Sequence, residues 1–70
     1  EDGYFFVNLD EEKSAIVVLY TLEGKEVWKQ QYAPQKVYNE HLDFEGITSG
    51  TYILKCVVGE QQVVKKIVIR

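Results

Sequence analysis

The apolar residues of this chain come in short runs of β-branched and aromatic side chains, and residues typical of turns separate the runs. Val, Ile, Thr, Tyr, Phe and Trp account for 27 of the 70 residues, whereas Ala occurs twice and Met is absent. Such side chains suit a pleated, half-buried surface and lose rotamer freedom in a helix. The pattern therefore predicts an all-β fold with no helix longer than a turn or two.

The length of the chain leaves room for one domain, which we expect to span residues 1–70. A domain near this size buries only about 60% of the surface that its unfolded chain exposes, so its stability margin is small. Cys56 is the one cysteine, which excludes an internal disulfide. Cys56 and His41 cannot by themselves supply a structural zinc, which takes four nitrogen or sulfur ligands. We therefore expect neither a metal nor a cofactor.

Charge and hydropathy exclude several classes of protein. A net charge of −3 argues against a nucleic-acid partner, which would require a basic surface. No apolar run reaches the roughly 18 residues that a membrane span needs. Hydrophobic residues make up 46% of the chain, which excludes disorder. Because the chain begins with Glu1 rather than Met, we interpret it as a fragment or a processed product.

Turn signals divide the apolar runs into six candidate strands. The run 16–20 is apolar on both faces and predicts a central strand. Gly24 and Gly59 each stand beside a glutamate and predict hairpin turns, because glycine tolerates positive φ. We expect breaks at the charged segment 10–14 and at Pro34, which cannot donate to a ladder. The predicted strands are 4–9, 15–22, 25–32, 36–44, 51–58 and 61–69. This order favours a small antiparallel immunoglobulin-like β-sandwich, with a closed barrel as the alternative.

Three motifs carry a resemblance to a known family. Residues 16–27 read IVVLYTLEGKEV, residues 42–52 read LDFEGITSGTY, and residues 65–70 read KKIVIR. In this order they resemble the hairpin, the glycine–x–tyrosine block and the closing lysine motif of the C-terminal sorting domains of the type IX (Por) secretion system of certain Gram-negative bacteria. Thr21 stands where the family usually has aspartate, and Glu45 where it usually has serine. The family's proline–asparagine–proline segment is missing.

The resemblance implies a non-catalytic secretion signal. Such a domain directs a cargo, fused on its N-terminal side, through the periplasm and across the outer membrane to the cell surface or the medium. The implied partners are the secretion machinery and its surface peptidase, which removes the domain. We expect Lys65, Lys66 and Arg70 to be the side chains that the machinery recognises, because they form the closing motif.

The glycine–x–tyrosine block also has a structural interpretation. Gly50 sits where the chain turns into a strand, and Tyr52 can bury its ring and return its hydroxyl to the preceding loop, as in a tyrosine corner. The Ile47 side chain is expected to pack against the core and so attach that loop to it. Together with Gly24, these residues are predicted to maintain the fold.

Other residues suggest alternative functions. Trp28 is expected to be a packed aromatic residue on the third predicted strand, and the alternative is a sugar-stacking platform that it forms together with Tyr32 and Tyr38. Cys56 is interpreted as an inert buried thiol and His41 as solvent-facing, and no oxyanion motif supports a nucleophilic pair of the two.

Two further sets of polar residues do not match a known site. The acidic residues of the segment 10–12 lack the spacing of a calcium loop. Ser14 and Ser49 lack a nucleophile motif.

The main alternative to a sorting signal is an immunoglobulin-like binding module. Such a module would bind carbohydrate or protein on a secreted or cell-surface bacterial protein. An enzyme is a distant third. A cargo encoded upstream favours the sorting signal, whereas a position in mid-chain favours the binding module.

Overall fold

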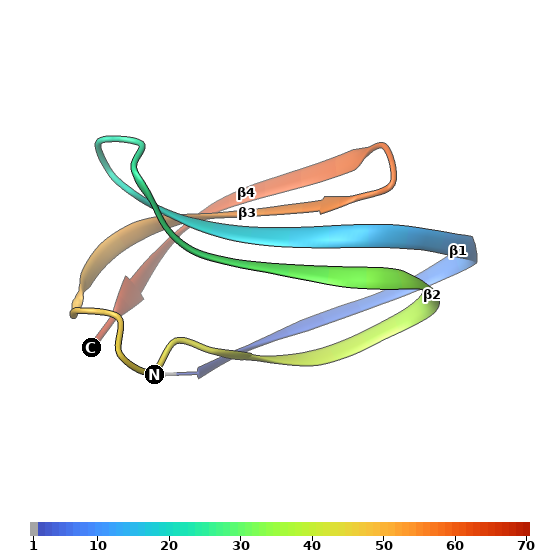
Figure 1. The fold of residues 1–70 in the computed structure, drawn as a ribbon, viewed down its shortest axis with the longest axis horizontal. Helices are drawn as coiled ribbons and strands as arrows, with labels where there is room; N and C mark the ends of the chain where they lie inside the picture. Colours follow the sequence, from blue (N-terminus) through green and yellow to red (C-terminus); the bar gives the residue numbers. More distant parts are fainter. Residues whose placement is uncertain (1) are drawn as a thin grey trace.

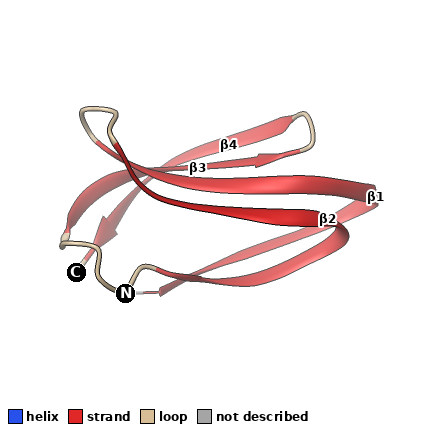
Figure 2. Ribbon diagram, in the orientation of Figure 1, coloured by secondary structure: helices blue, strands red, loops and turns tan. Residues whose placement is uncertain are grey.

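A computed structural model describes the backbone of residues 2–70 and the side chains from Gly3 onward. Its strands are all antiparallel, as Figures 1 and 2 show, and no residue in this range is helical. This confirms the predicted all-β class. The strands are β1 (Asp2–Thr21), β2 (Glu26–Asp43), β3 (Gly50–Val58) and β4 (Gln61–Ile69), in the order β2-β1-β3-β4 within one sheet. Across residues 2–70, no helix is long and apolar enough to span a membrane.

The described residues 2–70 form four strands in a single sheet, rather than the six strands that were predicted. The charged segment 10–14 and the segment around Pro34 bend β1 and β2 instead of ending them. Both bends fall at the same place in the ladder, where Asn8 pairs with Val37 and Lys13 with Gln35, so the register shifts but the two strands remain partners. Pro34 is tolerated because β2 lies at the edge of the sheet.

The double bend folds the sheet back over itself, as Figure 1 shows. The first half of β1 and the second half of β2 (residues 3–8 and 37–43) form a short layer. The other halves of these strands, together with β3 and β4, form a long layer. The core lies between the two layers. Its buried members are Phe5, Ala15, Val17, Leu19, Tyr38, Leu42, Phe44, Tyr52, Val58 and Ile69.

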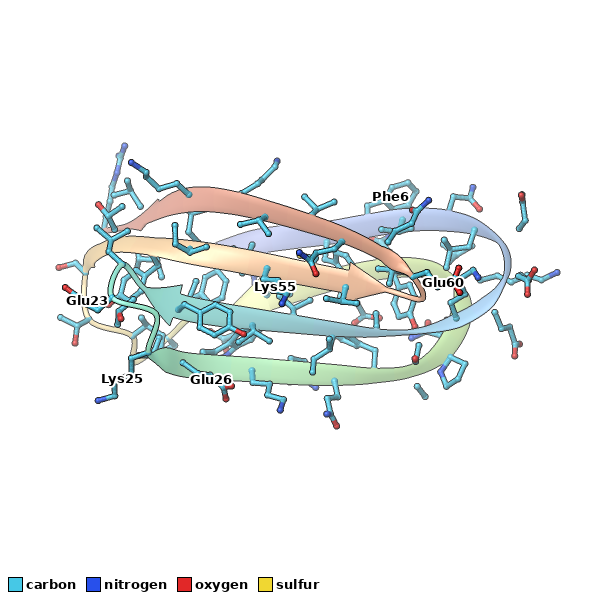
Figure 3. All side chains as sticks on the ribbon, turned by 90° about the horizontal axis from the view of Figure 1, so that it is seen from above. Phe6, Glu23, Lys25, Glu26, Lys55 and Glu60 are labelled. Carbon is cyan, nitrogen blue, oxygen red and sulfur yellow. The ribbon has the colours of Figure 1, made fainter. Side chains whose placement is uncertain are left out.

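The run 16–20 occupies the centre of the long layer, between β2 and β3, which confirms the predicted central strand. Val17 and Leu19 face the core and are fully buried. Val18 faces outward but is also buried, because it lies between Lys29 of β2 and Lys55 of β3, which is labelled in Figure 3. Lysine stems commonly cover apolar surface in this way.

Both hairpin turns form where glycine predicted them. Gly59 and Glu60 join β3 to β4, with Gly59 at φ 58°. Gly24 has φ 96° and donates its N–H to the Thr21 carbonyl at 2.9 Å. The Thr21 hydroxyl oxygen accepts the Lys25 N–H at 3.1 Å, so threonine provides a side-chain acceptor where the resembling motif has aspartate. Charged side chains surround this turn in Figure 3.

Replacing Gly24 with alanine should destabilise the domain by about 1–2 kcal/mol, because L-residues are strained at positive φ. In a domain of this size, that cost lowers the melting temperature by roughly 4–16 °C, which thermal unfolding followed by circular dichroism would detect. Gly3→Ala is the matched control, since its φ is not positive and an added Cβ meets the Phe44 ring at an ordinary 3.8 Å. Equal melting temperatures for the two variants would contradict the prediction.

Candidate recognition surface

Strand β4 is the outer strand of the long layer, and within residues 2–70 it pairs with β3 alone. Its first six residues, 61–66, are all exposed. The exposed side chains of β4, together with Arg70, form what we call the C-terminal edge surface. It is both basic and apolar, because Val63, Val64 and Val68 are more than half exposed beside the lysines. Lysines on an edge strand oppose unintended pairing with another sheet.

The three predicted recognition residues lie on this surface but not on one face. Lys65 pairs with Leu54 and lies on the face of the sheet that is directed toward the short layer. Lys66 pairs with Ile53 on the outer face. Arg70 follows the last residue of β4 and is exposed. The structure therefore presents the basic groups on both sides of one strand edge.

Two apolar residues between these basic groups attach β4 to the core. Ile69 is buried and pairs with Gly50, and Ile67 is half-buried and pairs with Tyr52. The closing motif is thus paired directly with the glycine–x–tyrosine block. This pairing gives the exposed lysines a fixed position relative to the core.

The loop between β2 and β3 is held by its own backbone and by Tyr52. The Ile47 N–H donates to the Phe44 carbonyl at 3.0 Å, and the half-buried Ile47 side chain packs against the core. The Tyr52 ring is 8% exposed, and its hydroxyl donates to the Thr48 carbonyl. Gly50 begins β3 at φ 154°, which L-residues rarely adopt, and a Cβ there would meet the Tyr52 ring at 3.7 Å. The geometry is that of a tyrosine corner.

The three aromatic residues considered for sugar binding do not form an exposed platform. Tyr38 is fully buried, and Trp28 and Tyr32 are half-buried against the core. Trp28 meets Phe44 edge to face at 4.9 Å between ring centroids, and Tyr32 meets Tyr38 in the same manner at 5.8 Å. Burial, and then the charge of Glu40, raises the pKa of the Tyr32 phenol above its usual value. These contacts indicate that the three rings pack within the domain and do not form a ligand-binding surface.

Cys56 and His41 lie in different environments and do not form a pair. Cys56 faces the core from β3, and burial raises the pKa of its thiol although Lys65 acts to lower it. A thiol with a raised pKa is a weak nucleophile at neutral pH. His41 is exposed on the short layer, where its ring lies 5.2 Å from that of Tyr4. Within the described residues, no group of acidic, histidine or cysteine side chains could hold a metal ion.

The structure assigns Tyr38 a role that the sequence analysis missed. Its hydroxyl lies within hydrogen-bond distance of the carbonyl of Lys13, at the bend of β1, and of Ala33, at the bend of β2, the latter at 2.9 Å. The Tyr38 hydroxyl can therefore donate a hydrogen bond to a backbone carbonyl at either bend. The order of residues gives no signal for this contact, because 25 positions separate Tyr38 from Lys13.

Two exposed aromatic residues were also missed. Tyr4 and Phe6 are 78% and 65% exposed, and Figure 3 shows Phe6 projecting from β1. A signal for them exists in the sequence. Side chains alternate along a strand, so the inward positions of Phe5 and Val7 direct Tyr4 and Phe6 to the outside.

A comparison with protein families gives a match over residues 1–70 to the family described as the secretion system C-terminal sorting domain. The chain belongs to this family. The sorting domain is therefore a C-terminal signal for type IX secretion, and the family is a sorting signal rather than a catalytic domain. Membership implies a cargo on the N-terminal side, the type IX machinery as partner, and export toward the cell surface or the medium. Comparisons with curated proteins and with solved structures give no match.

Proposed function

We propose that the type IX machinery recognises this domain at the C-terminal edge surface, through Lys65, Lys66 and Arg70. The observation that carries the proposal is the pairing of β4 with the glycine–x–tyrosine block. Ile69 of β4 is buried in the core, and the exposed basic groups on the same strand are thereby held in position. A sheet edge with unpaired backbone groups is a common platform for protein recognition. In this proposal, Gly24, Ile47, Gly50 and Tyr52 maintain the fold and do not contact the machinery.

We also propose the route by which the protein is exported. Residues 1–70 act as one domain at the C-terminal end of a larger secreted protein, whose cargo part passes through the periplasm. A surface peptidase then removes the domain. The two facing layers and the tyrosine corner support an immunoglobulin-like arrangement of the bent sheet.

A triple charge swap, Lys65→Glu with Lys66→Glu and Arg70→Glu, tests the recognition step. The lysines and Arg70 are exposed, so each change should alter the free energy of unfolding by no more than about 0.5 kcal/mol. A periplasmic reporter fused ahead of residues 1–70 should reach the surface or medium of a competent host. The charge-swapped fusion should instead accumulate in the periplasm, as measured by cell fractionation.

The matched control changes three other exposed lysines, Lys25, Lys29 and Lys36, to glutamate. It alters the net charge equally but leaves β4 intact, so its reporter should be exported as the wild type is. Equal export of both triple variants would show that the basic groups are not what the machinery reads. Failure of the wild-type fusion to leave the periplasm would overturn the sorting role of residues 1–70 as a unit.

A further inference from the structure

An apolar groove of about 460 Å³ opens at the side of the domain where the short layer ends. All of residues 3–7 of β1 contribute to one wall, and β4 contributes the opposite wall. Side chains alternate between the faces of a strand, so a wall built from consecutive residues exposes the edge of that strand. The floor includes Leu54, Cys56 and Val58 of β3.

The groove exists because the two layers differ in width. The short layer contains two half-strands, whereas the long layer contains four strands. The middle of the inner face of β3 and β4 therefore lacks a cover. Cys56 pairs there with Val63, and Leu54 pairs with Lys65. Val63 is 53% exposed although it lies on the inner face, and Leu54 and Cys56 are half-buried.

Among the residues that the structure describes, the edge of β1 beside the groove has no strand partner. Residues 15–20 of β1 pair with β2 on one side and β3 on the other. Residues 2–8 pair with β2 alone within the described chain. Their remaining backbone N–H and C=O groups are thus available to a further strand.

The groove carries a positive charge on one wall. Lys65 is the one charged residue among those that line it in the described part of the chain. An occupant with a carboxylate directed at Lys65 would therefore be favoured over one with a cation.

We propose that this groove binds one extended, acidic peptide segment of a partner protein, which adds to the free edge of β1 as a third strand of the short layer. Its inward side chains cover Cys56 and Val63, where β-branched residues fit, and an inward carboxylate meets Lys65. Strand addition of this type draws affinity from main-chain hydrogen bonds and specificity from alternate side chains. Peptide binding in this groove is a property beyond the proposed sorting function, and the purified chain should show it without export.

The test titrates the purified, isotope-labelled chain with a capped peptide of about six residues, a common strand length, in which valine alternates with threonine and one inward valine is replaced by glutamate. Amide shifts from nuclear magnetic resonance should saturate at residues 3–7 and around Cys56 and Val63. The glutamate peptide should bind roughly tenfold more tightly than its lysine analogue, a difference of about 1.4 kcal/mol.

Two variants on adjacent residues separate a specific contact from general charge attraction. Lys65→Glu should reverse the preference, so that the lysine peptide binds more tightly. Lys66→Glu changes the charge equally but lies on the outer face, so the preference for glutamate should persist. A peptide with N-methylated backbone amides along one edge should lose binding, because it cannot pair with β1.

Three results would overturn the proposal. The first is the absence of saturable shifts at residues 3–7 with millimolar peptide. The second is equal binding of the N-methylated peptide, which would show simple apolar adsorption. The third is a concentration-dependent dimer of the chain, seen by sedimentation, that shifts the same amides, because a second copy would then be the occupant.

Discussion

Tyr38→Ala should destabilise the domain by about 3–5 kcal/mol, the range found when a large buried aromatic residue is truncated. Tyr38 is 0% exposed, and its ring contacts Phe5 at 5.6 Å and Tyr32 at 5.8 Å between centroids. The substitution also removes the hydroxyl that can donate to the carbonyls of Lys13 and Ala33. A small domain has a small stability margin, so we expect a large unfolded population even without denaturant.

Urea unfolding followed by Trp28 fluorescence and circular dichroism measures this effect. Tyr38→Phe retains the ring and removes only the hydroxyl, so it should cost about 0.5–1.5 kcal/mol, the net value of a typical hydrogen bond. Tyr4→Ala is the surface control, since Tyr4 is 78% exposed, and it should change stability by no more than about 0.5 kcal/mol. If Tyr38→Ala unfolded at the same urea concentration as Tyr4→Ala, Tyr38 would not hold the bent strands together.

Tyr52→Ala is expected to have an effect of similar size, about 3–5 kcal/mol, for a related reason. The ring is buried and packs beside Gly50, and the hydroxyl donates to the Thr48 carbonyl in the loop before β3. Loss of the ring frees that loop and removes the packing partner of Ile67 on β4. The variant should therefore also loosen the strand that carries the proposed recognition residues.

Thermal unfolding and hydrogen exchange distinguish these two consequences of Tyr52→Ala. The melting temperature should fall, and the amides of residues 61–69 should exchange faster than in the wild type. Tyr52→Phe should cost about 0.5–1.5 kcal/mol and leave the exchange of β4 nearly unchanged. An unchanged melting temperature for Tyr52→Ala would show that the corner does not stabilise this domain.

The features that depend on neighbouring residues could be predicted from the amino-acid sequence. β-branched and aromatic runs gave the all-β class, and the run 16–20, apolar on both faces, located the central strand. Gly24 and Gly59 located two turns because positive φ is a property of a single residue. The hairpin, glycine–x–tyrosine and closing motifs led to the correct family because their order survives in the chain.

Whether a polar segment ends a strand or bends it depends on contacts between residues that are distant in the chain. The segments 10–14 and 33–35 look like turns locally, yet the same two strands resume their pairing beyond them, held by contacts such as that of Tyr38 with Lys13. The unequal layers and the groove follow from this bend. Alternation along a strand places the adjacent Lys65 and Lys66 on opposite faces, but only strand pairing shows that Lys65 is the one directed toward the groove. Such outcomes depend on residues far apart in the chain, and no local pattern encodes them.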